Sequence, residues 1–136
     1  MQVTAIIAEW NPLHRGHLLP VQAARQQGAT HIVAILSGNF VQRGEPALCP
    51  WQYRAAAALS SGVDLVLHLP LPYAVSTAQY FAGGAVASLA ALGAVDSLIF
   101  GSECGELAAL RSVAAALDSP ELPAALAPHL QKGLPF

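Results

Sequence analysis

Two histidines, His14 and His17, lie three residues apart in the stretch AEWNPLHRGH, which directly follows an aliphatic run. This spacing places both imidazole rings on one side of a helix start. The free N–H groups and the dipole of that helix favour an anion at the same point. Gly16 lets the backbone approach a ligand closely, and Asn11 and Pro12 shape the turn before it. The stretch therefore predicts a triphosphate site, in which the imidazoles donate to phosphate oxygens and stabilise charge on departing pyrophosphate.

Other interpretations of the histidine pair have to be weighed against this one. An HxxH pair on a helix can bind a metal, but a metal needs a third or fourth ligand and the sequence offers no obvious one nearby, so we predict no metal site built by the protein. Both histidines could also be ordinary surface residues, although their position straight after the first strand argues against that. The GxGxxG fingerprint of NAD-type folds and the Walker A loop are both absent, which disfavours a dehydrogenase or a P-loop enzyme.

The loop SGNFVQRGEP holds two further candidates for contact with substrate or phosphate. Arg43 could bind a phosphate or an acyl group, because arginine suits oxyanions, or it could order the loop through an ion pair with Glu45. Asn39 could bind substrate or simply form a turn. Both pairs of alternatives stay open at the level of sequence.

A structural role is expected for other chemically suggestive residues. Glu103 suits the first turn of a helix, where a negative side chain is favoured. Histidines in or beside apolar strands are expected in the core or at the rim of the sheet, aromatic residues at helical positions are expected to pack, and the second cysteine is expected to be structural: His31, His68, Trp51, Tyr53, Phe81 and Cys104.

The elements that must position these residues alternate along the chain. Buried strands are expected at 3–8, 31–36, 64–69 and 95–100, and helices at 17–27, 51–61, 77–92 and from GSECGE to about residue 117. Pro20 is tolerated because it falls in the first turn of its helix. The segment PLPY is expected to be a rigid turn, and the proline-rich segment 119–136 to hold at most one short helix. This βαβαβαβα order predicts an α/β fold with a doubly wound parallel sheet and right-handed crossovers.

In a doubly wound sheet, ligands bind beyond the carboxyl ends of the strands. The histidine motif follows the first expected strand, and GSECGE follows the fourth. Both loops therefore lie on the same rim, which is where we expect the site.

Composition narrows the possible partners. Charged residues make up 10% of the chain and hydrophobic residues 54%, against about 25% charged in an average soluble domain. Part of the apolar surface is therefore expected to meet a further segment, another domain or a second copy of the chain in a homo-oligomer. Six Lys and Arg residues and a net charge of −2 leave no basic stripe, so any RNA surface must be small or lie outside these residues.

Cysteine usage and hydropathy bear on the compartment. Cys49 and Cys104 form no CxxC pair, which fits reduced thiols in the cytoplasm. The most membrane-like window, residues 82–100, contains three glycines and Asp96 and divides more naturally into a helix and a strand than into a membrane span. We therefore expect a cytoplasmic protein with no membrane partner.

Five blocks in the same order resemble the bacterial tRNA(Met) cytidine acetate ligase family, a branch of the HIGH-motif nucleotidyltransferase superfamily. They cover most of residues 5–105, and they read IIAEWNPLHRGH, SGNFVQRGEPA, GVDLVLHLPLPYA, FAGGAV and LGAVDSLIFGSECG. NPLHRGH carries the HxGH signature of the superfamily. One such motif would be weak evidence, whereas five ordered blocks are specific.

The resemblance implies a Rossmann-like nucleotide-binding domain and a two-step reaction. Members activate acetate with ATP as acetyl-adenylate, with magnesium bridging the phosphates, and transfer the acetyl group to N4 of the wobble cytidine of elongator tRNA(Met). By this resemblance His14 and His17 would be catalytic, and Gly101 and Ser102 would line the adenosine side. The stretch that wraps ATP would be Ile7, Ala8, Glu9, Trp10, Asn11, Pro12, Leu13, His14, Arg15, Gly16, His17, Leu18, Leu19 and Pro20.

Members of the resembled family are much longer than 136 residues. We therefore expect residues 1–118 to form the ATP-binding domain and 119–136 to begin a further part, which would carry the tRNA surface. Two alternatives stay open: an HxGH adenylyltransferase acting on a phosphorylated small molecule, and a nucleotide-binding portion without catalysis of its own.

Overall fold

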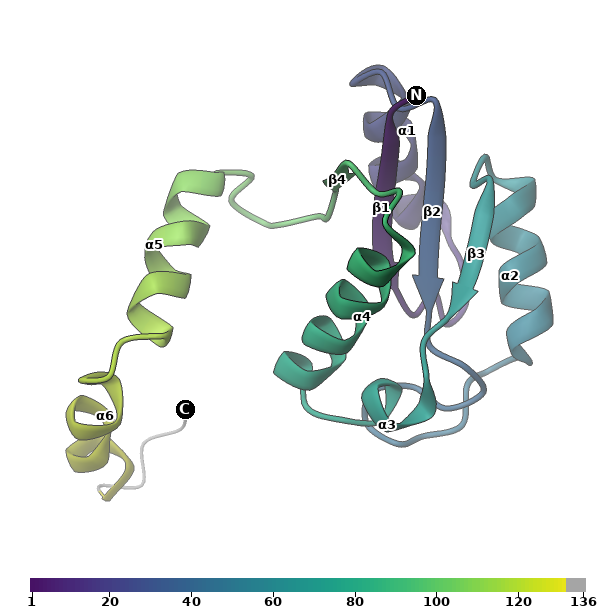
Figure 1. The fold of residues 1–136 in the computed structure, drawn as a ribbon. Coiled ribbons are helices and arrows are strands. Elements are labelled where there is room, and N and C mark those ends of the chain that lie inside the picture. Colours follow the sequence, from purple (N-terminus) through teal and green to yellow (C-terminus); the bar gives the residue numbers. More distant parts are fainter. Residues whose placement is uncertain (132–136) are drawn as a thin grey trace. The chain divides into compact units, whose positions relative to one another are not determined.

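A computed structural model describes residues 1–131 of the chain, which form two compact units that divide between Phe100 and Gly101 (Figure 1). The first unit is built on a parallel sheet of four strands in the order β3-β2-β1-β4. The strands are β1 (Val3–Ala8), β2 (His31–Leu36), β3 (Leu65–His68) and β4 (Ser97–Leu98). The predicted parallel α/β sheet is confirmed.

The fourth strand is shorter than the predicted 95–100. β1 and β2 pair over six residues, whereas β4 pairs with β1 only through Ser97 and Leu98. The physical reason lies at Asp96, whose carboxylate accepts the Val3 N–H at 2.7 Å in place of a backbone carbonyl. Backbone bonds from Asp96 N–H to the Val3 carbonyl and from Ile99 N–H to the Ala5 carbonyl still hold the flanking residues against β1.

The helices of the first unit lie close to their predicted positions. A short 3-10 turn, η1 (Arg15–His17), leads into α1 (Leu18–Gln26), and the later helices are α2 (Trp51–Ser60), α3 (Leu71–Ala74) and α4 (Ala78–Leu92). The prediction of a rigid turn at PLPY was wrong, because α3 begins there. Pro72 falls in its first turn, where a missing N–H costs no hydrogen bond.

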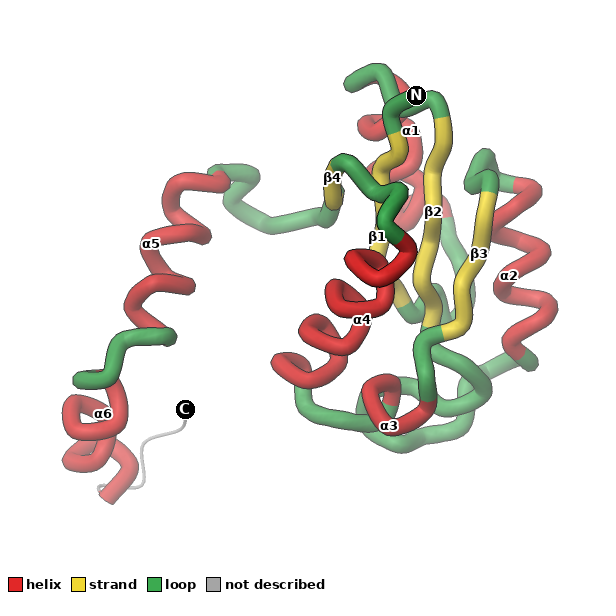
Figure 2. Tube along the Cα trace, in the orientation of Figure 1, coloured by secondary structure: helices red, strands yellow, loops and turns green. Residues whose placement is uncertain are grey.

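The two faces of the sheet are covered by different helices (Figure 2). Ile32, Ala34 and Leu36 of β2 pack with side chains of α1 and α2, whereas Val33 and Ile35 pack with side chains of α3 and α4. This alternation follows from the two-residue period of a strand, and it confirms the doubly wound arrangement.

The second unit holds α5 (Leu107–Leu117) and α6 (Leu122–Gln131). One helix therefore falls within the described part of 119–136, as predicted, while residues 132–136 lie outside the described residues. The domain limit expected near residue 118 stays a prediction. Within residues 1–131 no helix is both long enough and apolar enough to cross a membrane.

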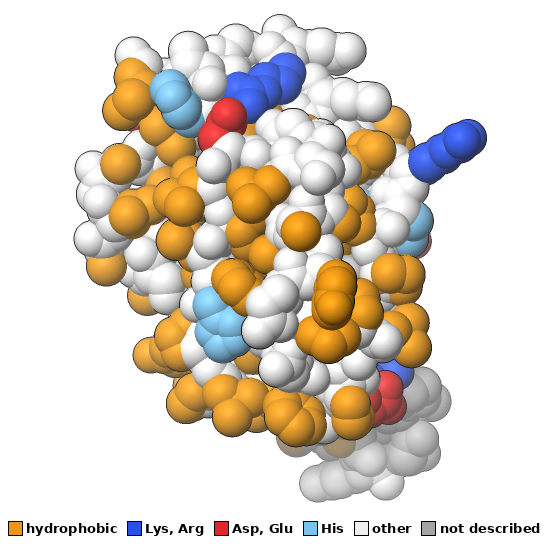
Figure 3. All heavy atoms as spheres, turned by 90° about the vertical axis from the view of Figure 1, so that its right-hand side faces the viewer, with side chains coloured by type: hydrophobic (Ala, Val, Ile, Leu, Met, Phe, Trp, Pro, Cys, Tyr) orange, Lys and Arg blue, Asp and Glu red, His pale blue; other side chains and the backbone are white. Residues whose placement is uncertain are grey.

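Several side chains lie elsewhere than predicted. Tyr53 is 71% exposed and Cys104 is exposed, so neither packs in a core. His31 and His68 lie at opposite ends of their strands and are both exposed, which fits the rim alternative. On the face shown in Figure 3, hydrophobic side chains cover much of the surface and charged side chains only a few places. The expectation that apolar surface meets another chain or segment stays a prediction.

Candidate nucleotide site

His14 and His17 lie side by side at the carboxyl end of β1. Their rings stack with centroids 3.6 Å apart and planes 24° apart. The Gly16 N–H donates to His14 Nδ1 at 3.1 Å, and the His14 N–H donates to His17 Nδ1 at 3.3 Å. A ring nitrogen that accepts a hydrogen bond carries no proton, so each neutral ring carries its proton on Nε2. The turn therefore leaves two adjacent N–H donors available for an anion.

Gly16 lets the two rings stand this close to the backbone. A Cβ at this position would lie 3.1 Å from His14 Cε1 and 3.2 Å from His14 Nδ1. These distances are tighter than ordinary van der Waals contact, and the crowded atom is the acceptor of the Gly16 N–H. A larger residue would push the His14 ring away from its capping position.

The Trp10 ring lies near the His17 ring. The Trp10 side chain is only 4% exposed and belongs to the cluster on the α1 and α2 face, and its ring centroid lies 6.4 Å from that of His17. Its backbone has φ of 46°, the left-handed region that costs a non-glycine residue about 1–2 kcal/mol. Neighbouring contacts must therefore hold the chain at Trp10 in place.

Side chains of the loop after β1 bind the loop after β2. Glu9 Oε1 accepts the Gln42 N–H at 2.6 Å, and Asn11 Oδ1 accepts the Leu48 N–H at 2.7 Å. The carboxylate and the amide oxygen are thus committed to the neighbouring loop. Within the predicted ATP-wrapping stretch, Glu9 and Asn11 therefore join the two loops.

Asn39 forms a side-chain hydrogen bond within the fold, whereas Arg43 is exposed. Asn39 Oδ1 accepts the Trp51 N–H at 2.8 Å and so satisfies a free donor at the start of α2, which is a structural role between distant residues and not a local turn. Arg43 is exposed, and in the described part of the chain it forms no ion pair with Glu45. Its side chain lines an open hollow of about 490 Å³ together with Gln42, Val75, Ser76 and Thr77. Contact of either residue with substrate stays a prediction.

The remaining predicted site residues fall into two groups. Among residues 7–20 only Trp10 is buried, and the histidine turn is open to solvent. Gly101 and Ser102 are exposed and belong to the second unit, where Ser102 Oγ accepts the Gly105 N–H at 2.9 Å. Their contact with a nucleotide stays a prediction.

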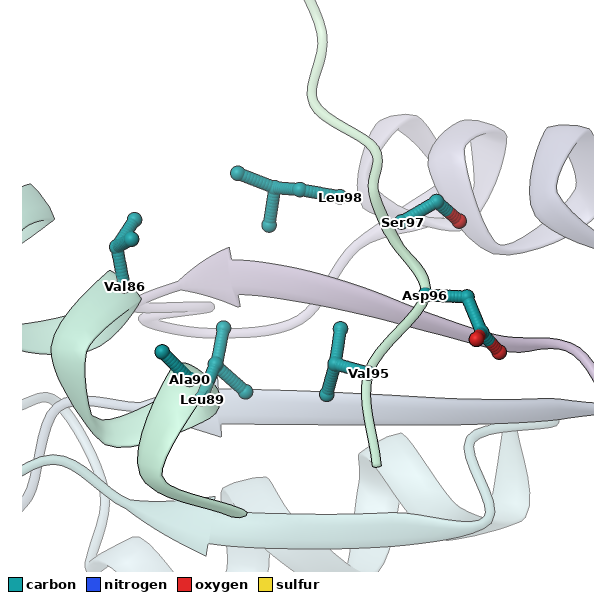
Figure 4. Close-up of a pocket in the computed structure, with 7 residues that line it drawn as sticks. All are labelled: Val86, Leu89, Ala90, Val95, Asp96, Ser97 and Leu98. Carbon is teal, nitrogen blue, oxygen red and sulfur yellow. The ribbon is translucent and has the colours of Figure 1, made fainter. Parts of the chain in front are cut away.

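A second hollow, of about 240 Å³, lies between α4 and β4 (Figure 4). Mostly apolar side chains line it: Val86, Leu89, Ala90, Val95, Asp96, Ser97 and Leu98. Its one charged group, the Asp96 carboxylate, is negative and already accepts a backbone N–H. This hollow offers nothing to a triphosphate.

One residue at the carboxyl rim was not predicted. Arg54 is 1% exposed, and its guanidinium reaches the backbone of the loop after β1. The only signal in the sequence is a single arginine in the helix WQYRAAAALS, four residues before the buried Ala58.

No group of three or more His, Cys, Asp or Glu side chains in residues 1–131 is arranged to hold a metal ion. The acidic residue nearest the motif in sequence, Glu9, already accepts a backbone N–H.

Stability at mildly acidic pH gives a test of the histidine geometry. Burial and the neighbouring His14 lower the pKa of His17 below its ordinary value of 6.5. As pH falls, the unfolded chain takes up this proton first, so the His17 contribution to stability is complete above pH 6.5 and is lost as pH falls through the folded pKa. Urea unfolding at about pH 7.5 and 5.5 should show a larger loss in the wild type than in His17→Asn, which cannot titrate. Equal losses would contradict the lowered pKa.

The chain is similar to known proteins along its whole length. The HIGH Nucleotidyl Transferase family matches residues 1–136. The tRNA(Met) cytidine acetate ligase of Alkaliphilus metalliredigens is 47% identical over an alignment of 139 positions, which covers all of this chain and 33% of that protein. That of Syntrophotalea carbinolica is 51% identical over 119 residues, which is 87% of this chain and 28% of that protein. The chain thus spans about a third of the length of the curated relatives it matches.

Solved structures show the same fold. A crystal structure of Thermotoga maritima TmcAL bound with alpha-thio ATP has a TM-score of 0.88 and 42% sequence identity, and the match covers all of this chain and 34% of that one. The apo form of the same protein has a TM-score of 0.89. From its sequence, its parallel sheet and its histidine turn, the chain belongs to the HIGH nucleotidyl transferase family.

Proposed function

We propose that this chain is the ATP-binding portion of a tRNA(Met) cytidine acetate ligase. The observation that carries the proposal is the histidine turn, which presents two adjacent Nε2–H donors at the carboxyl rim of the sheet. Relatives of 47% identity bear that ligase name, and a related structure is bound with alpha-thio ATP. The triphosphate would lie across His14 and His17, at the start of α1.

The two Nε2–H donors would act in the first step, the activation of acetate. The carboxylate of acetate attacks the α-phosphorus of ATP, and the bond to the bridging oxygen breaks, so that pyrophosphate leaves with the electron pair and acetyl-adenylate forms. Negative charge grows on the leaving pyrophosphate during this step. The Nε2–H groups of His14 and His17 would stabilise that charge through fixed hydrogen bonds, which require no reorganisation during the reaction.

The second step needs a nucleophile from outside this chain. The N4 amine of the wobble cytidine attacks the acetyl carbonyl, AMP leaves, and the amine loses a proton. Net charge is −2 and the chain has six Lys and Arg residues, so the tRNA surface is assigned to the part of the relatives that this chain does not span. The same proposal includes acetate as the substrate, elongator tRNA(Met) as the acceptor and the cytoplasm as the location.

Further contacts belong to the same proposal. Magnesium would be held by ATP phosphate oxygens and water, because Mg²⁺ commonly keeps several waters and binds through substrate phosphates. Gly101 and Ser102 would line the adenosine side, and Arg43 would lie within reach of a phosphate or the acyl group.

Calorimetric titration with ATP, followed by acetate-dependent exchange of pyrophosphate into ATP, tests the proposal. We expect one ATP to bind per chain, and any exchange to require acetate. Failure of a folded sample to bind ATP would contradict the proposal. Exchange with a phosphorylated acceptor but none with acetate would favour an adenylyltransferase that acts on small molecules.

A further inference from the structure

Arg54, in the first turn of α2, is a buried cation that binds backbone carbonyls. Its side chain is 1% exposed. Among residues 1–131 it forms no ion pair, whereas Arg25 pairs with Asp64 at the other end of the strands. Four carbonyl oxygens accept from the Arg54 guanidinium instead, those of Glu9 at 2.6 Å, Ser37 at 3.0 Å, Cys49 at 3.3 Å and Gly38. Burying a charge is costly unless its hydrogen bonds are satisfied, so this guanidinium holds its acceptors in fixed places.

These acceptors belong to the two loops at the carboxyl rim. Glu9 follows β1, Ser37 and Gly38 follow β2, and Cys49 ends the second loop just before α2. One planar group therefore fixes the end of β1 relative to the end of β2. The bonds from Glu9 Oε1 to Gln42 N–H and from Asn11 Oδ1 to Leu48 N–H join the same two loops farther out.

The bond to Glu9 acts directly on Trp10. The Glu9 carbonyl is part of the peptide plane that precedes Trp10, and the orientation of that plane sets the Trp10 φ angle of 46°. The Arg54 donor therefore favours the left-handed conformation of Trp10 over the ordinary region of φ. The chain leaving Trp10 leads to the histidine turn, and the Trp10 ring lies against His17.

We propose that Arg54 is a positioning residue of the nucleotide site, which holds Trp10 in its left-handed conformation and thereby sets where His14 and His17 present their Nε2–H donors. The inference rests on the proposed function, because ATP is the ligand that those donors would meet. Among residues 1–131 the Arg54 guanidinium donates to no atom of the histidine turn itself, and Glu9 is its acceptor in the loop after β1, so its effect on the ligand passes through Trp10.

Arg25 provides a matched control in the same chain. It also binds backbone carbonyls, those of Ala29 at 3.0 Å, Thr30 at 2.8 Å and Gly62 at 3.0 Å, and it pairs with Asp64 at 2.6 Å. These acceptors lie at the amino ends of β2 and β3, away from the rim that carries the histidines. An Arg25→Lys change removes the same kind of contact without touching the site.

Two measurements on Arg54→Lys, Arg25→Lys and the wild type test the inference at a temperature where all three are folded. The first is the ATP dissociation constant by calorimetry. Arg54→Lys should weaken binding about tenfold, the scale of one lost hydrogen bond to a charged group, and Arg25→Lys less than about twofold. The second, without ATP, is amide hydrogen exchange, which should be faster at Gly16, Gln42 and Leu48 in Arg54→Lys than in Arg25→Lys.

The outcomes separate this inference from the proposed function. Wild-type affinity and wild-type exchange in Arg54→Lys would overturn the inference, and so would equal weakening of ATP binding in both variants. A folded wild type that binds no ATP would overturn the proposed function, and the exchange comparison would still decide whether Arg54 holds the rim loops. If Arg54→Lys does not fold, the wild type decides: ATP should slow exchange at Gln42 and Leu48 as well as at Gly16, and no change there would overturn the inference.

Discussion

His17→Ala is expected to weaken ATP binding by about 10- to 100-fold, because the change removes one donor to a charged phosphate, an interaction worth about 1.5–3 kcal/mol. The His17 ring is partly exposed and packs on the His14 ring and near Trp10, so the fold should survive its loss. Calorimetry gives the dissociation constant, and thermal unfolding of the same sample shows that the variant is folded.

The two ring nitrogens of His17 can be tested separately. Glutamine places an amide N–H near the position of Nε2, whereas asparagine places an amide oxygen near that of Nδ1. His17→Gln should therefore retain more ATP affinity than His17→Asn, which keeps only the acceptor for the His14 N–H. His31→Ala, at the opposite end of the strands, serves as the control and should bind ATP like the wild type. Full affinity in His17→Asn would mean that the ring only caps the turn.

The sheet could be predicted because the sequence marks its strands and the ends of its helices clearly. β1 and β2 are continuous apolar runs, as strands buried on both faces must be, and Gly93 ends α4 in the left-handed conformation that glycine adopts freely. The βα alternation then leaves few topologies. The histidine turn was found for a similar reason, since its residues are neighbours in sequence and sit at a predictable point of the fold.

The rest of the site depends on contacts between distant segments. Arg54 bonds to Glu9 across 45 positions and Asn11 bonds to Leu48 across 37, and no local pattern marks such partners. The left-handed Trp10 is equally invisible, because a tryptophan there contradicts local preference and is held by tertiary contacts. Tyr53 was wrongly placed in the core because a helix of mostly small residues gives little sign of which face is buried.

Replacing either of two adjacent glycines in α4 by alanine is expected to change the stability of the protein, in opposite directions at the two positions. Gly83 is exposed and a Cβ there would meet nothing within 4 Å, so Gly83→Ala should stabilise the protein by about 0.5–1 kcal/mol through helix propensity. Gly84 is buried, and a Cβ there would overlap Tyr73 Cγ and lie 2.7 Å from Tyr73 Cβ. Because Tyr73 Cβ is fixed to the backbone of α3, no rotation of the ring relieves this contact, and Gly84→Ala should cost about 1–3 kcal/mol.

Urea unfolding of the two variants beside the wild type measures this difference, and each variant is the control for the other because both add one methyl group to the same helix. Gly84 belongs to the face of the sheet covered by α3 and α4, whereas Trp10 packs on the face covered by α1 and α2. Gly84→Ala should therefore lower stability and leave the ATP dissociation constant of the folded protein unchanged. If both alanines stabilised the protein, α4 would not approach Tyr73 as closely as the structure shows. If Gly84→Ala weakened ATP binding while the protein stayed folded, the two faces of the sheet would be coupled, and the histidine turn would depend on more than the contacts of Arg54 and Trp10.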